Sequence, residues 1–240
     1  PGQFVRHDSV DKVLLRDLPS LYGISDVQEL NSLFTMIAYH SGMEFSYESM
    51  SNESGVKKET IRKYIQYLEA AFLIKIVTRT DDTAKRFQRQ TTFKIYLTNP
   101  SLRCALFEPI RMIDGNIGDM IETAIYSQWI PRKGHIAYAN WKMGRSQGEV
   151  DLVGINDALQ KPYWAVEIKW SDRFFDKPSE LSSLQYFMEK NHLPQALVTS
   201  ISKGGAKNMD FGTLHFIPSA CYAYTVGENT LRQANKSFGL

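Results

Sequence analysis

Residues 149–155 read EVDLVGI and residues 164–170 read WAVEIKW. Polar and apolar residues alternate over residues 149–152 and over residues 166–170. This alternation predicts two β-strands, because successive side chains of a strand point to opposite faces. Asp151 stands on one face of the first strand, and Glu167 and Lys169 share a face of the second. Each strand therefore buries one face and carries charge on the other, which is costly unless the charges have a task.

The acidic pair has the composition of a site for a hard divalent cation. Mg²⁺ (or Mn²⁺) takes one or two carboxylates and keeps its other positions for water and phosphate oxygens, so Asp151 and Glu167 are the expected ligands. Lys169 would orient or deprotonate the attacking water, or stabilise charge in the transition state. Glu149 shares a face with Asp151 but stands nearer the turn, and we prefer Asp151. A solvated cross-strand ion pair is the alternative for the same pattern.

The elements around these strands follow a definite order. Apolar periodicity predicts a helix over 117–130, a strand over 135–143, the two charged strands, a helix opened by Pro178 and a strand over 194–202. Over about residues 115–202 this order resembles the core of the PD-(D/E)xK nuclease superfamily.

The resemblance implies two further site residues. Members of the superfamily often supply an acidic residue from the first helix, and Glu122 is the candidate here. They also carry a glutamine on the helix after the lysine strand, for which Gln185 is the candidate. An ordinary glutamine at the border of a helix is the alternative for Gln185, because it adjoins an apolar stripe.

The first part of the chain shows a different pattern. Helical spacing of apolar residues recurs over 27–37 and 61–72, and two extended runs follow at 73–80 and 93–99. Helices that end in two strands joined by a polar segment indicate a winged helix-turn-helix over residues 25–98. Its first helix should begin with a capping box formed by Ser25 and Gln28.

Basic residues of this module are the candidates for contact with nucleic-acid phosphates. Three stand on the expected recognition helix and three in the polar segment between the extended runs: Lys57, Lys58, Arg62, Lys85, Arg86 and Arg89. The attraction would be local, because the formal net charge of the chain is only +2. The helical residues could instead merely keep their helix soluble. Winged helices also serve as protein docking modules, so contact of this module with a protein is a further alternative to contact with DNA.

Five segments together resemble one larger arrangement. They are KKETIRKYIQYLEAAFLI (57–74), KIYLTNPSLRCALF (94–107), GDMIETAIYSQW (118–129) and the two charged strands. They resemble the C-terminal region of bacterial and archaeal AAA-type ATPases, in which an ATPase domain is followed by a winged helix and a PD-(D/E)xK-like domain known as domain of unknown function 4143. ATP would bind only through a domain absent from this chain, because no G-x-x-x-x-G-K-[ST] run occurs.

We therefore expect an α/β (α+β) chain with an N-terminal winged helix-turn-helix and a restriction-endonuclease-like domain. Residues 1–24, which begin without methionine, read as a connector from a missing ATPase domain. Residues 25–98 form the winged helix and residues 99–240 the nuclease-like domain. Apolar residues of the connector, such as Leu14 and Leu18, would face the ATPase domain or pack on the winged helix.

Composition bounds the remaining questions. The apolar content of 43% is that of an ordinary soluble chain, and no apolar run approaches 18 residues, so we expect no membrane contact and a cytoplasmic location. Cys104 and Cys221 are far apart in the sequence, which argues against a disulfide framework. Near the C-terminal end, TLHFIPSACYAYTV with its Pro218 predicts an edge strand.

Two functions of different classes follow from these patterns. The first is a Mg²⁺-dependent phosphodiesterase acting on DNA. The second is a noncatalytic module that uses the nuclease fold and the winged helix to dock an ATPase onto DNA or a protein. In both cases the expected partners are DNA and the N-terminal AAA ATPase domain, through which a homo-oligomer could form.

Overall fold

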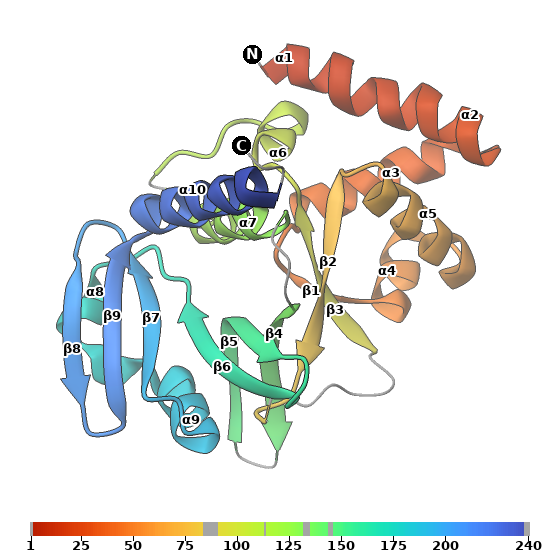
Figure 1. The fold of residues 1–240 in the computed structure, drawn as a ribbon. Coiled ribbons are helices and arrows are strands. Elements are labelled where there is room, and N and C mark those ends of the chain that lie inside the picture. The colour runs from red at the N-terminus through yellow and green to blue at the C-terminus, as the bar shows by residue number, and fades with distance from the viewer. Residues whose placement is uncertain (1, 84–90, 113, 132–134, 144–145, 238–240) are drawn as a thin grey trace. The chain divides into compact units, whose positions relative to one another are not determined.

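The protein is mixed α/β, as the computed structural model in Figure 1 shows. It divides into two compact units. The first unit holds residues 1–76 and 91–127, and the second holds residues 77–90 and 128–240. The predicted boundary at residue 98 falls inside the first unit. The structure describes residues 2–83, 91–112, 114–131, 135–143 and 146–237.

The first unit begins with an unbroken helical run over residues 2–22. It consists of α1 (Gly2–Val5), the π-helical segments η1 (Arg6–Asp11) and η2 (Val13–Asp17), and α2 (Leu18–Tyr22). Val10, Leu14 and Leu18 recur every fourth residue and are buried in the core of this unit, whereas Leu15 is exposed. The apolar face of the run therefore packs on the helices of its own unit.

The rest of the first unit combines helices with short strands. The elements are α3 (Val27–Tyr39), β1 (Glu44–Ser46), α4 (Tyr47–Ser54), α5 (Lys58–Ala70), the start of β2 (Ile74–Thr80), β3 (Thr92–Leu97), α6 (Ser101–Leu106) and α7 (Ile117–Trp129), whose last two residues belong to the second unit. Strand β1 pairs antiparallel with β3, which neighbours β2. Helix α3 begins one residue later than the predicted Ser25 cap, because the carboxylate of Asp26 accepts the backbone N–H of Glu29 (2.9 Å).

The second unit is built on one mixed sheet. Its elements are the end of β2, β4 (His135–Met143), β5 (Ser146–Asn156), β6 (Lys161–Glu167), α8 (Arg173–Asp176), η3 (Pro178–Glu180), α9 (Ser182–Asn191), β7 (Gln195–Ser200), β8 (Gly205–Met209), β9 (Gly212–Pro218) and α10 (Ser219–Ser237). The strand order is β2-β4-β5-β6-β7-β9-β8. The β2–β4, β6–β7 and β7–β9 pairs are parallel, and the other pairs are antiparallel.

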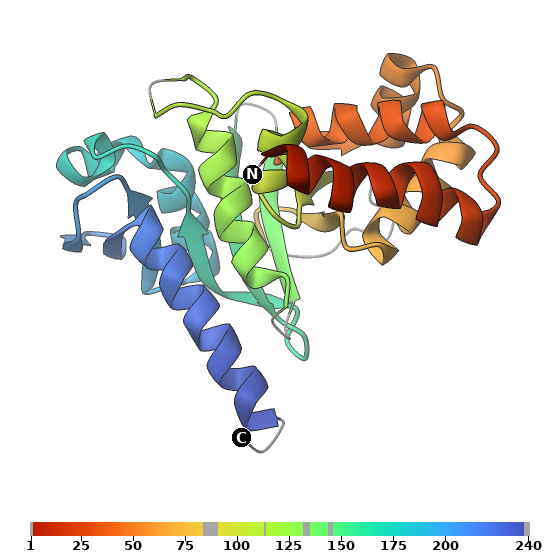
Figure 2. The same ribbon diagram turned by 90° about the horizontal axis from the view of Figure 1, so that it is seen from above.

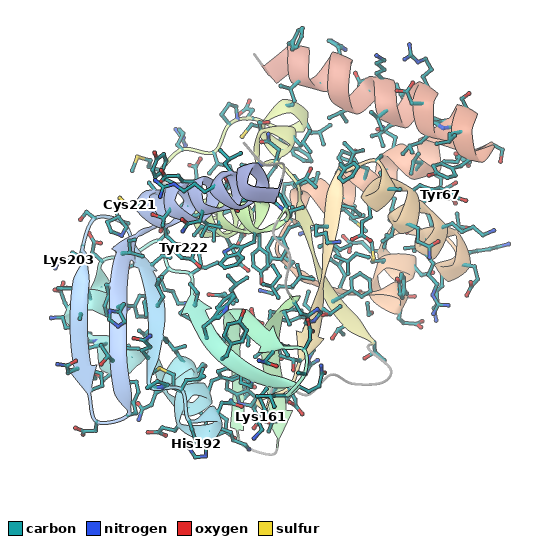
Figure 3. All side chains as sticks on the ribbon, viewed as in Figure 1. Tyr67, Lys161, His192, Lys203, Cys221 and Tyr222 are labelled. Carbon is teal, nitrogen blue, oxygen red and sulfur yellow. The ribbon has the colours of Figure 1, made fainter. Side chains whose placement is uncertain are left out.

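Helices α9 and α10 cover this sheet (Figure 2). Leu184, Phe187 and Met188 of α9 are fully buried with Val153 and Ala165 in one apolar cluster. Because side chains alternate along a strand, the neighbours of these strand residues point to the other face. There Tyr222 of α10, which Figure 3 labels, is buried and lines a cavity of about 360 Å³ together with residues of β6, β7 and β9. The sheet is thus packed on both faces.

The segment after β2 is tied to α9 by a buried carboxylate. Asp82 is 2% exposed, accepts a hydrogen bond from Tyr186 (2.8 Å) and pairs with Lys190 (2.9 Å). Burial alone would raise the pKa of Asp82, but the hydrogen bonds from Lys190 and Tyr186 outweigh it and lower the pKa. This contact places residues 77–83 with the second unit.

Two glycines of β5 stand opposite tryptophans. Gly148 pairs with Trp141 of β4, and Gly154 pairs with Trp164 of β6. A Cβ atom on Gly148 would lie 2.3 Å from the ring of Trp141, and one on Gly154 would lie 2.1 Å from the ring of Trp164. Each indole therefore covers the bare backbone of the facing glycine, and no larger residue fits beneath it.

The prediction of an edge strand near Pro218 is wrong in two respects. Strand β9 lies between β7 and β8, so it is internal. The extended run ends at Pro218, and Ser219 begins α10. The Ser219 hydroxyl donates to the carbonyl oxygen of Ser200 (2.8 Å), which holds the start of the helix at the end of β7.

Candidate active site

The pairing of β5 with β6 sets the two carboxylates side by side. Leu152 pairs with Val166 in the antiparallel register, so the next step brings Asp151 opposite Glu167. Directly opposed residues of an antiparallel pair point to the same face. The structure therefore brings together two acidic side chains that are 16 positions apart in the sequence.

A β-bulge near the hairpin turn determines this register. Gly154 pairs with Trp164, but Ile155 pairs with Pro162. Tyr163 is thus an extra residue on β6, and its side chain is 60% exposed. The pairing on the site side of the bulge is shifted by one residue relative to the pairing at the turn.

Lys169 completes the cluster. Asp151 is 7% exposed and Glu167 is 6% exposed. The Lys169 Nζ lies 2.7 Å from Glu167 Oε1 and 3.7 Å from Asp151 Oδ2. Glu167 Oε2 is buried without a hydrogen-bond partner in the described part of the chain. One lysine therefore faces two buried carboxylates, and one carboxylate oxygen has its hydrogen-bonding capacity unused.

Electrostatics at Glu167 reflect this excess of negative charge. Burial raises the pKa of Glu167 to about 8, and the nearby Asp151 carboxylate acts in the same direction, while Lys169 lowers it. The Asp151 Oδ2 accepts the backbone N–H of Ile168 (2.7 Å), which fixes that carboxylate in place. A second cation at Glu167 would relieve the cost that burial imposes on its charged form.

Backbone contacts fix Lys169 just beyond the end of β6. Its N–H donates to the Thr199 Oγ1 (2.8 Å), and the same hydroxyl donates to the carbonyl oxygen of Lys169 (3.0 Å). Thr199 is fully buried in β7, which runs parallel to β6. The site thus lies at the carboxyl ends of two parallel strands, where open α/β sheets commonly bind ligands.

Asp172 lies in the loop that follows β6, and it holds the loop that follows β7. Its carboxylate accepts the backbone N–H groups of Ile201 (3.0 Å), Ser202 (2.8 Å) and Lys203 (3.2 Å), and the Ser202 hydroxyl (2.6 Å). The hydrogen bonds from Ser202 lower the pKa of Asp172 to about 2. Lys203, which Figure 3 labels, also pairs with Asp176 of α8 (2.6 Å). The two loops at the end of the site are therefore connected.

Replacing Asp172 by alanine is expected to loosen this loop without removing any group of the acidic cluster. Losing the charge-assisted hydrogen bonds should cost about 1–3 kcal/mol in the free energy of unfolding. Because the folded pKa is depressed, the contribution of Asp172 is present above the ordinary Asp pKa and is lost as pH falls towards 2. Urea unfolding at pH 7 and pH 2.5 measures both effects. Asp210→Asn, in the exposed β8–β9 turn, is the control, and equal losses in the two variants would refute the role of Asp172.

Glu149 has a hydrogen-bond partner on the neighbouring strand, and its charge also raises the pKa of Glu167. It pairs with Asn140 of β4, whose side-chain amide donates to Glu149 Oε2 (2.8 Å). Glu149 is half-buried, so its charge costs less than that of Asp151. The choice of Asp151 over Glu149 as the metal ligand stays a prediction.

Glu122 belongs to the first unit. On α7, its Oε1 accepts hydrogen bonds from Lys94 Nζ (3.0 Å) and from the Tyr96 hydroxyl (2.5 Å), both on β3. Lys94 is only 4% exposed, so the ion pair is buried and needs both members. The role of Glu122 beside a metal stays a prediction, and its described partners give it a structural task in its own unit.

Gln185 is half-exposed on α9 and donates from its amide nitrogen to Glu189 Oε1 (3.1 Å), one turn further along the same helix. This contact is the kind that stabilises exposed helix faces. Gln185 thus lies at the border of the apolar face of α9, while its role in a nuclease site stays a prediction.

The candidate phosphate contacts on α5 are exposed, and two of them pair with acidic residues. Lys58 pairs with Glu48, and Arg62 Nη1 lies 3.3 Å from Glu59 Oε1. Lys57 precedes the helix and is exposed. The predicted contacts Lys85, Arg86 and Arg89 lie outside the described residues.

The donor set can hold a small divalent ion. Among the described residues no three His, Cys, Asp or Glu side chains are grouped so that they could hold a metal ion. Asp151 and the unused oxygen of Glu167 nevertheless offer the two carboxylates that Mg²⁺ takes when water and phosphate fill its other positions. The residues present therefore fit Mg²⁺ and do not fit a metal that needs a closed protein cage.

Sequence reasoning missed the residues that position the site. Thr199 and Asp172 carry no motif, and each acts through backbone groups of a distant segment. The available signal was their location, because Asp172 follows the lysine strand directly and Thr199 lies near the end of the next predicted strand. Polar residues at the carboxyl ends of adjacent parallel strands meet at one edge of a sheet.

Comparison with known proteins bears on the first unit. Residues 2–112 are similar to a family described as Domain of unknown function (DUF8612). The matched span includes α1 to α6 and contains none of the acidic cluster. No curated protein matches the sequence, and no solved structure matches it either. No helix in the described ranges has both the length and the apolar character needed to cross a bilayer.

Proposed function

We propose that this protein is a Mg²⁺-dependent phosphodiesterase acting on DNA, with its site on β5 and β6. The observation that carries the proposal is the cluster of two buried carboxylates and one lysine, in which Glu167 Oε2 has no partner in the described part of the chain. One carboxylate is enough to neutralise Lys169 in a purely structural ion pair. The second carboxylate supplies a further ligand and negative charge for a divalent cation.

Asp151 and Glu167 would hold the ion. Bound Mg²⁺ supplies a Lewis acid for a phosphate oxygen and lowers the pKa of a coordinated water. The Lys169 ammonium, which is 30% exposed, would donate hydrogen bonds to the attacking water or to a non-bridging phosphate oxygen. Thr199 keeps the Lys169 backbone in position, and Asp151 is oriented by the Ile168 N–H.

The finer fold assignment is part of the same proposal. The order α3-β1-α4-α5-β2-β3, with β1 paired to β3, supports a winged helix within the first unit. The order α7-β4-β5-β6-α9-β7 supports a PD-(D/E)xK nuclease-like domain. We further propose that this pair of modules forms the C-terminal region of an AAA-type ATPase. The support for that is the succession of sequence segments.

A cleavage assay with matched carboxylate variants tests the proposal. Supercoiled plasmid and single-stranded DNA are incubated with the protein in Mg²⁺, Mn²⁺ or EDTA. Asp151→Asn is expected to lower the cleavage rate by at least about 100-fold, because it removes a metal ligand and leaves its volume unchanged. Glu149→Gln, on the same strand face, is expected to stay within about fivefold. Equal losses in the two variants would contradict the assignment of Asp151.

A noncatalytic docking role is the second candidate. It is favoured by the net charge of +2 and by the acidic partners of Lys58 and Arg62 on α5. DNA binding that persists in EDTA, together with no cleavage by the wild type in either metal, would support docking and refute the nuclease.

A further inference from the structure

Arg103 on α6 is a buried cation in the first unit. Only 6% of its surface is exposed. The centre of its guanidinium lies 5.4 Å from the centre of the Tyr39 ring and 5.5 Å from that of Phe107. Within the described residues Arg103 makes these ring contacts but no hydrogen bond or ion pair through its side chain. The aromatic faces are its only electrostatic partners there.

Ring contacts alone are a poor replacement for water around a guanidinium. Removing an ion from water costs more than aromatic faces return, and a buried charge usually has a counter-ion. Arginine also presents five N–H donors in a rigid planar fork, which matches the oxygens of a carboxylate or a phosphate. Arg103 therefore has the donors of an anion site.

A cavity of about 740 Å³ opens beside Arg103. Phe107, Pro109 and Ile110 give it an apolar wall. The second basic residue of its lining, Arg111, is exposed and engaged with Asp114, at 3.1 Å between the side chains and 2.7 Å from the Arg111 backbone N–H. These contacts lower the pKa of Asp114 and use its carboxylate. Arg103 is thus the cation left for a ligand.

Besides Asp114, which is engaged with Arg111, the lining holds one more carboxylate, and its negative charge would repel an anionic ligand. Glu108 also borders the cavity, but it is exposed, so water screens its charge. The buried position of Arg103 has no such screening. The balance of the cavity therefore favours an anionic group at Arg103 and an uncharged body away from Glu108.

We propose that this cavity binds an organic oxyanion, a phosphate monoester or a carboxylate on an apolar body. Arg103 holds the anionic group, and Phe107, Pro109 and Ile110 contact the body. The inference does not depend on the nuclease proposal, because every residue that it uses belongs to the first unit.

Calorimetric titration of the full chain with phenyl phosphate and with benzoate tests the site. The two probes share a phenyl ring, so their relative affinity distinguishes a phosphate site from a carboxylate site. Ionic strength is held constant with NaCl. Arg103→Met is expected to weaken binding roughly 10- to 100-fold, the loss typical of hydrogen bonds to a charged group. Arg103→Lys, which keeps the charge but loses the fork, should bind with intermediate affinity. Arg232→Met removes an exposed arginine of α10 and should bind as the wild type does.

Thermal unfolding separates a binding arginine from a structural one. Without an added anion, Arg103→Met is expected to melt no lower than the wild type, because it removes a buried charge without a counter-ion. Phenyl phosphate or benzoate should raise the melting temperature of the wild type, and the same concentration should raise that of Arg103→Met by much less. If Arg103→Met does not fold, the comparison of Arg103→Lys with the wild type gives the same test. Absence of saturable binding in the wild type, or equal affinity in the Arg103 variants, would overturn the proposal.

Discussion

Glu167→Gln is expected to abolish metal-dependent cleavage of DNA, with a loss of at least about 1,000-fold in rate. Glutamine has the same shape but offers no negative charge, so the metal loses a ligand and the reacting phosphate loses its Lewis acid. The assay compares single-turnover rates on plasmid and single-stranded DNA in Mg²⁺ and Mn²⁺. Glu189→Gln, an exposed substitution on α9 of the same unit, is the matched control and should retain the wild-type rate.

The same substitution has an effect on stability that depends on pH. The pKa of Glu167 is raised to about 8 in the folded state, so the folded protein holds this proton more tightly than the unfolded chain does. The stabilising contribution of Glu167 is complete below the ordinary Glu pKa and is lost as pH rises through 8. In EDTA, the melting temperature of the wild type should therefore fall relative to Glu167→Gln between pH 5 and pH 9.

Addition of Mg²⁺ should reverse this difference at high pH. An ion that binds the folded state stabilises it by mass action, and the ionised wild-type site offers two carboxylates whereas the variant offers one. Millimolar Mg²⁺ at pH 8.5 should raise the melting temperature of the wild type more than that of Glu167→Gln. Identical shifts in the two proteins would show that the ion binds elsewhere, and the nuclease proposal would then lose its site.

Gly154→Ala, which adds a single methyl group, is expected to lower the free energy of unfolding by about 2–3 kcal/mol. The new Cβ would lie 2.1 Å from Trp164 Cε2 and 2.2 Å from Trp164 Nε1, so the indole must move. Trp164 is not free to do so cheaply, because its ring stacks on Trp129 at a centroid distance of 5.0 Å. Urea unfolding measures the loss. Gly204→Ala, whose Cβ would meet its nearest atoms at 3.6 Å, should change the free energy of unfolding by less than about 0.5 kcal/mol.

A double-mutant cycle identifies the cause of this loss. In the Trp164→Ala background the space above Gly154 is open, so Gly154→Ala should then cost little. The difference between the two backgrounds is the coupling energy between the pair. An equal cost in both backgrounds would mean that the backbone at Gly154, and not the indole, resists the substitution.

Local patterns were enough to predict the strands and helices around the site. Alternation in EVDLVGI and WAVEIKW predicted β5 and β6 and the faces of their charges, because one-sided burial leaves a period of two. The helix expected over 117–130 is α7, and the strand expected over 135–143 is β4. The same alternation predicted the face of each charge, whereas the opposition of Asp151 and Glu167 depends on the bulge at Tyr163, and Lys169 lies just beyond the end of β6.

Contacts between distant segments could not be predicted in this way. Thr199 and Asp172 act on backbone groups about 30 residues away, and their partners depend on the parallel pairing of strands, which leaves no mark in local periodicity. The helix after Pro218 was missed because its first turns, rich in tyrosine and alanine, continue an apolar run that fits a strand equally well. Glu122 was chosen because it is an acidic residue on the expected helix. The sequence could not reveal that Lys94 and Tyr96 of β3 donate hydrogen bonds to it.

The bulge at Tyr163 has a consequence for the whole acidic cluster. If the register at the turn, where Ile155 pairs with Pro162, continued along the hairpin, Glu167 would stand opposite Val150. A shift of one residue changes the face to which a side chain points, so the Glu167 and Asp151 carboxylates would lie on opposite sides of the sheet. Tyr163 is therefore a spacer: its exposed ring contributes little to the core, but the length that it adds to β6 turns two separate acids into a pair. The proposed chemistry therefore depends on the length of β6 as well as on the presence of Asp151 and Glu167, since deleting one residue between the turn and Trp164 would separate the two carboxylates.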